Sequence, residues 1–195
     1  ISALGRLAHA FGLETVGKLS PVTAQPIEKR SPSWIGVYRE LTEWAVLLDV
    51  LRTKDFGTDT VIVFDGFLRS KIFSKGLFGR YQELLNEAIE LHYNKNRRKL
   101  YVAGVAKHSK FLQKYRLAFA IEGVMRNAYP CYVAVPEELE KKAYNWSEYV
   151  TGGGSGEGFS AGNMCMTKFG GRPTDPIWAI DVLKSQVDQV PTILG

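Results

Sequence analysis

Cysteine and histidine are scarce in this sequence, which has two cysteines and three histidines in 195 residues. Cys131 and Cys165 lie in apolar runs without CxxC spacing, and the histidines are dispersed, so neither a disulfide framework nor a zinc site is predicted. This cysteine usage fits a reducing cytoplasm. No apolar run approaches the roughly 18 residues of a membrane-spanning helix, so we expect a soluble protein. The glycine run at 152–158 lacks the Gly-Lys-Ser/Thr ending of an ATP-binding P-loop.

The sequence has enough apolar material for one well-covered core. Hydrophobic residues make up 45% and aromatic residues 12%, which predicts a single domain over residues 1–195. The 25 basic against 20 acidic side chains give a net charge of +5, which suits a phosphate-bearing partner without requiring one. The chain opens on Ile1 and stops at Gly195 without a polar tail, so we interpret it as an internal piece of a longer polypeptide.

Hydrophobic periodicity predicts alternating helices and strands after an irregular lead-in over residues 1–30, which contains at most one short helix at Ala3–Phe11. Ser31-Pro32 is interpreted as the N-cap and first position of a helix that ends at Arg52. The further expected elements are an interior strand at Thr60–Phe64, a helix over 77–92, a strand at Leu100–Ala106, a helix at Phe111–Asn127, a strand at Cys131–Val135, a helix opening at Pro136, a glycine-rich loop at Thr151–Gly162, and an antiparallel pair at Met164–Phe169 and Ile177–Val182.

Acidic side chains occur at two places that suit a metal ion. Asp65 follows the first strand and precedes Gly66, and catalytic groups of α/β sheets gather at strand ends, although an Asp-Gly pair also serves as a simple turn. Glu40 and Glu43 share one side of the preceding helix, with Glu40 nearer the apolar stripe. From the helix pattern alone, solvated acids paired with Arg39 or Lys54 are the favoured interpretation of both. Converging carboxylates of this kind suit Mg²⁺ or Mn²⁺.

Basic side chains follow the second strand, at Lys107, His108 and Lys110. They could pair with a phosphate or form an ordinary solvated turn. Further basic residues, Arg69 and Lys71 among them, could extend a groove along a nucleic-acid backbone. Three phenylalanines are interleaved with the basic residues of this region and are candidates for base stacking, although phenylalanine is more often a core residue: Phe67, Phe73 and Phe78.

Taken together, the runs at 39–44, 61–71 and 102–110 resemble NurA-domain nucleases in residues, order and spacing. The resemblance extends over roughly 33–182 and includes a late strand at Asp175–Asp181. It implies a ribonuclease-H-like α/β core with a mixed sheet flanked by helices. It also implies degradation of DNA ends with Mn²⁺ or Mg²⁺, as a homodimer bound to the hexameric HerA-like translocase during end resection.

Carried over residue by residue, Asp65 and Glu43 match metal ligands of the family, with Glu40 as the alternative to Glu43. Lys107 matches the basic residue near the scissile phosphate. The resemblance therefore implies phosphodiester hydrolysis in which carboxylates hold the cation and Lys107 offsets developing negative charge. Contacts with DNA are expected from four neighbouring side chains: Arg69, Lys71, His108 and Lys110.

Two departures from the family pattern concern the ends of the chain. Residues 1–30 contain no strand-borne acid, since Glu14 and Glu28 are poor candidates, and no late histidine precedes Gly195. Either the chain lacks the N- and C-terminal parts of the domain, or it is a domain that has lost catalysis and serves as a scaffold for DNA or the translocase. An Argonaute-type nucleic-acid-binding domain is a third interpretation, but no guide-end pocket is recognisable in the sequence.

Overall fold

The computed structural model describes residues 2–29, 33–70, 72–74, 76–106, 109–144 and 162–194. The predicted cap at Ser31-Pro32 and nearly all of the predicted glycine-rich loop lie outside these residues. The chain divides into two compact units. Ile1–Thr60 with Ser70–Leu100 form the helical unit, and Val61–Arg69 with Tyr101–Gly195 form the sheet unit. The single domain expected over 1–195 stays a prediction.

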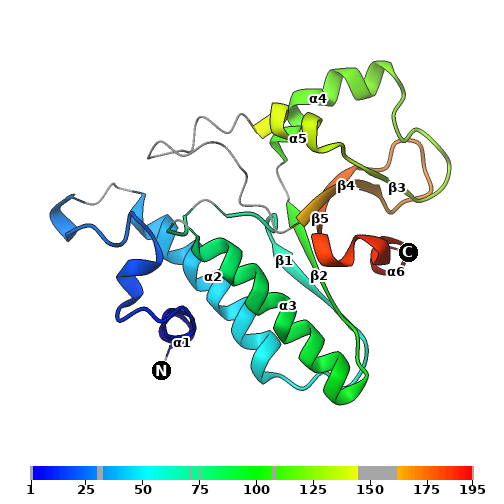
Figure 1. Ribbon diagram of the computed structural model, residues 1–195. Coiled ribbons are helices and arrows are strands. Elements are labelled where there is room, and N and C mark those ends of the chain that lie inside the picture. Colours follow the sequence, from blue (N-terminus) through cyan, green and yellow to red (C-terminus); the bar gives the residue numbers. More distant parts are fainter. Residues whose placement is uncertain are drawn as a thin grey trace. The chain divides into compact units, whose positions relative to one another are not determined.

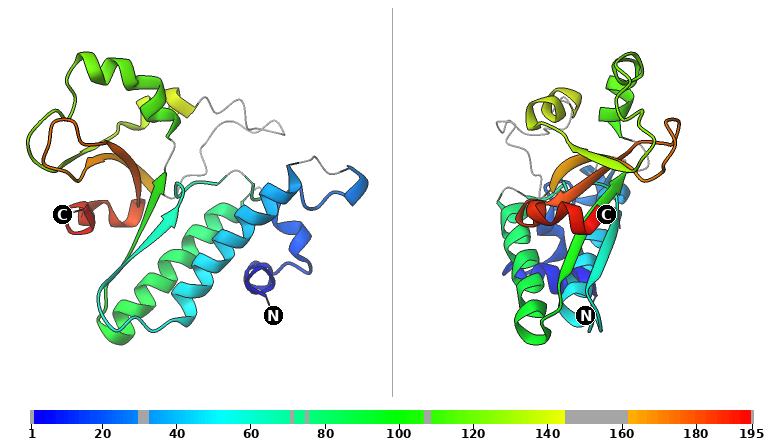
Figure 2. Two further views of the ribbon diagram at one scale, coloured as in Figure 1. Left: turned by 180° about the vertical axis from the view of Figure 1, so that it is seen from behind. Right: turned by 90° about the vertical axis from the view of Figure 1, so that its right-hand side faces the viewer.

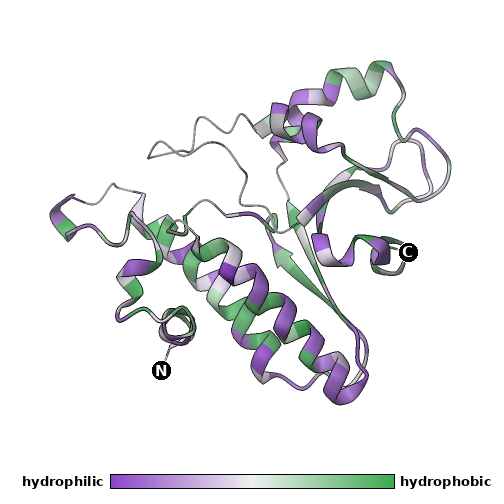
Figure 3. Cartoon of the chain, viewed as in Figure 1, coloured by the Kyte–Doolittle hydropathy of each residue, from purple (hydrophilic) through white to green (hydrophobic). Residues whose placement is uncertain are grey.

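The helical unit contains two long helices that lie side by side, α2 (Trp34–Thr53) and α3 (Leu77–Asn96) (Figure 1). Hydrophobic and hydrophilic residues alternate around both helices (Figure 3), as their periodicity predicts. The unit also contains α1 (Ala3–Ala10) and the 3₁₀ turns η1 (Val16–Leu19) and η2 (Ile27–Lys29). The predicted helices over 3–11, 32–52 and 77–92 are therefore confirmed, with ends shifted by one to four residues.

Aromatic rings fill the interface between α2 and α3. The ring centroid of Trp44 lies 5.2 Å from that of Tyr81 and 5.6 Å from that of Phe78, in both cases edge to face. The Tyr81 hydroxyl donates to the Trp44 carbonyl at 2.8 Å, and burial raises the pKa of this phenol. Phe73 completes the cluster. Phe73 and Phe78 are thus core residues, as the alternative to base stacking predicted.

The sheet has the order β1-β2-β5-β4-β3. Its strands are β1 (Thr60–Asp65), β2 (Leu100–Ala106), β3 (Cys131–Ala134), β4 (Gly162–Lys168) and β5 (Trp178–Leu183). Backbone bonds from Thr60 N to Lys99 O and from Gly66 N to Val105 O advance in the same direction along β1 and β2, so this pair is parallel. The pairs β2–β5, β5–β4 and β4–β3 are antiparallel. The predicted α/β class, the mixed sheet and the late antiparallel pair are confirmed.

The first strand is at the edge of the sheet, so its prediction as an interior strand is wrong. Burial alternates along β1, and Val61 and Val63 are exposed. The β-branched run indicated a strand correctly, but β propensity does not distinguish an edge strand from a central one. The exposed pair of valines makes this strand half-buried.

Helices cover both faces of the sheet (Figures 1 and 2). On the first face, Met164 and Met166 pack with Phe111 of α4 (Lys110–Ile121) and Ala143 of α5 (Glu137–Tyr144). On the second face, a smaller cluster packs against η4 (Lys184–Gln189) and α6 (Val190–Leu194). Its buried members are Ala103, Cys165, Ile180, Val182 and Val190.

Helix α4 ends six residues before the predicted end at Asn127. Gly123 has φ +63° and Met125 has φ +59°, so the backbone leaves the right-handed helical region directly after α4. In the part of the chain that the structure describes, no helix combines the length and hydropathy needed to cross a bilayer.

Candidate active site at the ends of beta1 and beta2

Asp65 is the last residue of β1, and its side chain is exposed. The following amide, Gly66 N, donates to Val105 O at 2.9 Å and so holds the end of β1 beside the end of β2. Gly66 has φ +145°, a conformation that other residues rarely adopt, which explains the glycine after the acid. Parallel strands end at the same edge of a sheet. The predicted position of Asp65 at a strand end is therefore confirmed.

The turn after Asp65 is fastened to the centre of the sheet by Asp181 of β5. Leu68 N donates to Asp181 Oδ2 at 3.0 Å, and Arg69 Nη2 donates to Asp181 Oδ1 at 2.7 Å. Both Leu68 and Asp181 have no exposed surface. A buried carboxylate is stable only when it is paired and hydrogen-bonded. The contacts with Leu68 and Arg69 meet this requirement and fix the path of the chain beyond Asp65.

Two glycines make room for this arrangement. A Cβ on Gly104 would lie 2.5 Å from the carbonyl oxygen of Gly66, and a Cβ on Gly162 would lie 2.9 Å from Cβ of Asp181. Neither distance is compatible with a side chain. The turn and the buried aspartate therefore depend on glycine in β2 and at the start of β4.

Arg69 also contacts a second carboxylate, that of Glu140 in α5. Its side chain is 8% exposed, and its guanidinium carbon lies 4.6 Å from the ring centroid of Phe67. Burial raises the pKa of Asp181 and of Glu140, and the positive charge of Arg69 opposes both shifts. A phosphate would have to displace a carboxylate to reach this guanidinium. The predicted contact of Arg69 with DNA stays a prediction, and the structure gives this residue an internal partner instead of solvent.

The sequence reasoning did not single out Asp181 and Glu140 as partners of Arg69. A signal for Asp181 was available, because it is the only charged residue in the apolar run Ile177–Leu183. An acid in the middle of a buried strand requires a cationic or amide partner. The partner itself, more than a hundred residues earlier in the chain, has no sequence signal.

The two candidate acids of α2 differ in their surroundings within the helical unit. Glu43 is exposed and lies 3.6 Å from Arg39 Nε, so the predicted alternative of an ion pair on the helix surface is confirmed for Glu43. Glu40 is half-buried and accepts a hydrogen bond from Ser70 Oγ at 2.7 Å. Burial raises the pKa of Glu40, whereas the contacts with Ser70 and Trp44 lower it. The prediction that Glu40 lies nearer the apolar stripe is confirmed.

Three of the predicted basic residues, Lys71, Lys107 and His108, lie outside the described residues. Lys110 is the first residue of α4 and is exposed. The preceding residue, Ser109, caps the helix by accepting the amide of Leu112 at 3.3 Å. Helix α4 therefore begins four residues after β2 ends, and Lys110 lies at its N-terminus.

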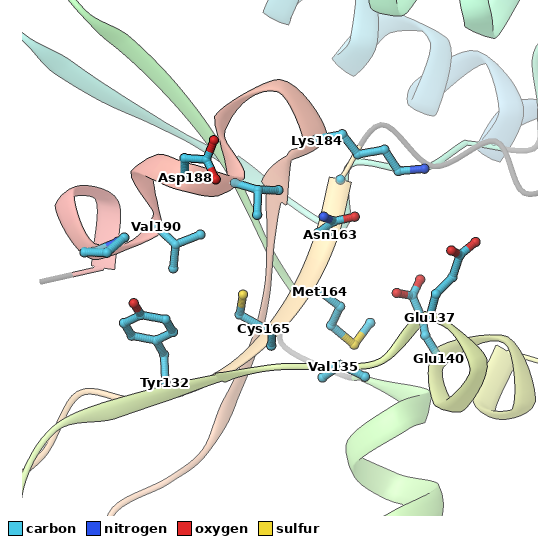
Figure 4. A pocket seen from close by; sticks show the side chains of 14 residues that line it. Tyr132, Val135, Glu137, Glu140, Asn163, Met164, Cys165, Lys184, Asp188 and Val190 are labelled. Carbon is cyan, nitrogen blue, oxygen red and sulfur yellow. The ribbon is translucent and has the colours of Figure 1, made fainter.

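A pocket of about 500 Å³ lies in the sheet unit, between β3, β4 and the segment η4–α6 (Figure 4). Asp188, Val190 and Tyr132 line one end, and Glu137 and Glu140 line the other. The buried Cys165 lies between the two ends, and burial raises the pKa of its thiol to about 11. This thiol is protonated at neutral pH and is a poor nucleophile. Apart from Lys184, the charged lining is acidic, which disfavours a phosphate.

Within the residues that the structure describes, no three acidic, histidine or cysteine side chains are grouped so that they could hold a metal ion. The metal site expected from Asp65 and Glu43 therefore stays a prediction. Comparisons of the chain with models of known protein families, with curated proteins and with solved structures found no match. The motifs around Glu43, Asp65 and Lys107 are thus the basis of the family resemblance.

Proposed function

We propose that this chain is the core of a metal-dependent DNA nuclease of the NurA type, with a ribonuclease-H-like sheet. The proposed reaction is hydrolysis of phosphodiester bonds at DNA ends, performed by a dimer together with a HerA-like translocase. The observation that supports it best is the bond from Gly66 N to Val105 O. It sets Asp65 beside the end of β2, the strand that leads into the basic segment 107–110.

The proposed chemistry assigns one task to each of three side chains. Asp65 and Glu43 would offer carboxylate oxygens, the ligands that Mn²⁺ and Mg²⁺ prefer, and a cation held by them would supply polarisation of the phosphate. Glu43 suits this role better than Glu40 because only a 3.6 Å surface contact with Arg39 has to be released. Lys107 offsets the charge that develops on the phosphate oxygens.

Cleavage of end-labelled single-stranded and duplex DNA with Mn²⁺ tests the proposal. We expect Asp65→Asn to lower the cleavage rate at least about a hundredfold. Even the loss of a residue that only hydrogen-bonds to a metal ligand typically lowers metal affinity or activity tenfold to a hundredfold. Its melting temperature should stay near that of the wild type because the side chain is exposed. Asp55→Asn, which changes another exposed aspartate, located after α2, is the matched control, and EDTA should abolish cleavage. Unchanged cleavage by Asp65→Asn would refute the assignment.

A non-catalytic scaffold is the second candidate function. It is favoured by two facts, the missing strand-borne acid in residues 1–30 and the enclosure of Arg69 between two carboxylates. The same assay separates the two functions. A wild-type chain that binds DNA or the translocase but does not cleave with Mn²⁺ supports the scaffold, and the assay on a longer chain then distinguishes a fragment from a domain without catalysis.

A further inference from the structure

Helix α4 is far more apolar than its burial requires. Eight of its twelve residues are apolar, yet Phe111 is the one residue of the helix that is buried. A helix that is apolar on most of its sides is normally enclosed by other elements. Within the part of the chain that the structure describes, one side of α4 is packed and the other is exposed. The apolar residues on the exposed side therefore indicate a partner.

A row of aromatic rings, spaced four residues apart, marks the packed side of α4. Phe111 packs with Met164 and Met166 of β4. The ring centroid of Tyr115 lies 4.9 Å from that of Phe111 and 6.0 Å from that of Phe119. These contacts determine which side of α4 faces the sheet, and so which side faces solvent.

Leu117 and Ile121 lie on the solvent side of α4, one helical turn apart, and each is 72% exposed. Lys114 precedes Leu117 by three residues, and residues with this spacing lie on the same side of a helix. Arg116 is next to Leu117 in the chain, and both cations are exposed. We call these four residues the α4 surface: Lys114, Arg116, Leu117 and Ile121.

Positive charge is in excess around the α4 surface. The helix contains three cations and no acid. The excess persists when the neighbouring helix α5 is included, because residues 109–144 contain six basic and four acidic side chains. One of these acids, Glu140, is already the partner of Arg69. The β4–β5 hairpin adds one charge of each sign, Arg172 and Asp175. A partner with acidic side chains is therefore complementary to this surface.

Arg116 is the cation of this surface that is best suited to a carboxylate from outside. Among the described residues it has no hydrogen-bond or ion-pair partner. Lys114, in contrast, donates from Nζ to the carbonyl oxygen of Lys142 in α5. A guanidinium binds a carboxylate through two parallel hydrogen bonds, which fixes geometry as well as charge.

The aliphatic residues distinguish between the acidic partners that a basic surface could bind. Leu117 and Ile121 have no ring on which a nucleic-acid base could stack. A helix that binds a lipid surface buries a broad apolar face and carries its charges on the opposite one. In α4, cations and aliphatic residues share one side. This combination suits a second helix, whose side chains form both apolar and charged rows.

We propose that the α4 surface binds an acidic amphipathic helix of a partner protein. Apolar residues of that helix, three and four positions apart, cover Leu117 and Ile121. Its glutamate or aspartate side chains, placed beside this apolar row, pair with Arg116 and Lys114. Docking removes from water two aliphatic side chains that the chain itself leaves exposed. This docking surface is independent of the proposed nuclease function.

Binding of a synthetic peptide to the full chain tests the proposal. The probe is a fluorescein-labelled peptide of about 18 residues with leucine at the a and d positions of a heptad, glutamate beside them and alanine elsewhere. A second peptide has lysine in place of every glutamate. We expect the acidic peptide to bind at least about tenfold more tightly at low salt, and added salt to reduce the difference. Fluorescence polarisation measures both affinities.

Variants of the α4 surface show whether the peptide binds there. Leu117→Ser and Ile121→Ser should each weaken binding of the acidic peptide about tenfold, as expected for the loss of an apolar anchor. Arg116→Glu should narrow the preference for the acidic peptide over the basic one. The matched control is Leu91→Ser, which changes an exposed leucine of α3 and should keep wild-type affinity. Melting temperatures should stay near that of the wild type because all four side chains are exposed.

Equal affinity for the acidic and the basic peptide overturns the proposal. Wild-type affinity in both Leu117→Ser and Ile121→Ser does so as well, as does an equal loss of affinity in Leu91→Ser. Vesicles of phosphatidylserine and phosphatidylcholine test a lipid surface as the partner. If the wild-type chain binds these vesicles but not the acidic peptide, and Leu117→Ser abolishes vesicle binding, the α4 surface is a membrane site and the proposal of a helical partner is wrong.

Discussion

The helical unit and the sheet unit are stabilised in different ways. In the helical unit, the buried contacts between α2 and α3 include a cluster of neutral aromatic rings in edge-to-face contact, with Trp44 at its centre. In the sheet unit, the interior contains a cation between two carboxylates, Arg69 with Asp181 and Glu140. A core of the first kind depends on volume and ring geometry, and one of the second kind depends on every charge keeping its partner.

The comparison distinguishes residues that stabilise the packing of two helices from residues that fix the position of one turn. Aromatic contacts hold α2 and α3 together but tolerate rings of similar volume. The charges hold one particular turn, since Asp181 accepts both the amide of Leu68 and the guanidinium of Arg69. This turn follows Asp65 directly. The interior of the sheet unit is therefore the part of the molecule that fixes the candidate site.

The largest effect is expected from Asp181→Ala, which leaves the amide of Leu68 and part of the guanidinium of Arg69 without an acceptor. Breaking a buried pair from one side typically costs about 3–5 kcal/mol of unfolding free energy. Denaturant unfolding of the variant measures this loss. Asp188→Ala, an exposed aspartate seven residues later, is the control and should change stability by less than about 0.5 kcal/mol. Equal stability of Asp181→Ala and the wild type would contradict the distinction between the two interiors.

Most elements of the fold were predictable because they depend on local patterns. The apolar stripe of α2, the apolar run of β2 and the glycine-containing turn of the hairpin around Gly170 are local patterns. Each predicts its element from a few neighbouring residues. The edge position of β1 was not predictable, because β-branched residues such as Val61 and Val63 occur both in edge strands and in central strands. The strand order depends on pairings between distant segments, which no local pattern contains.

The next largest effect is expected from Gly104→Ala, which tests whether the turn needs close contact with β2. The new Cβ would lie 2.5 Å from the Gly66 carbonyl oxygen, a backbone atom that cannot move away alone. Overpacking of this kind typically costs about 1–3 kcal/mol. Gly36→Ala in α2 is the matched control, because a Cβ there meets no atom within 4 Å. It should stabilise by up to about 1 kcal/mol through helix propensity, and thermal unfolding of both variants shows whether the signs differ.

The candidate site was predictable only in part. Asp65 was found because an acid after a strand and before a glycine is a local signal. The pairing of Arg69 was missed because a basic residue near a predicted active site has the same sequence signature whether it contacts DNA or a buried acid. The exposure of Trp178 was also missed, because alternation places this residue on one face of β5 but does not show whether that end of the face is covered.

The smallest effect is expected from Glu40→Gln, which tests the helical unit, because Glu40 is a half-buried acidic residue in that unit. Burial raises the pKa of Glu40 above its usual value of 4.5, so the folded protein holds this proton to higher pH than the unfolded chain. Stability from this group is therefore complete below about pH 4 and is lost as the pH rises through the raised pKa.

Glu40→Gln cannot ionise and avoids this loss while keeping an acceptor for Ser70. Its stability relative to the wild type should increase between about pH 4 and pH 8 in urea unfolding. Glu43→Gln, which loses only a surface ion pair, should show little change over the same range. A relative stability of Glu40→Gln that falls with pH would mean that Ser70 and Trp44 outweigh burial, and that the helical unit, like the sheet unit, stabilises a charge by pairing it.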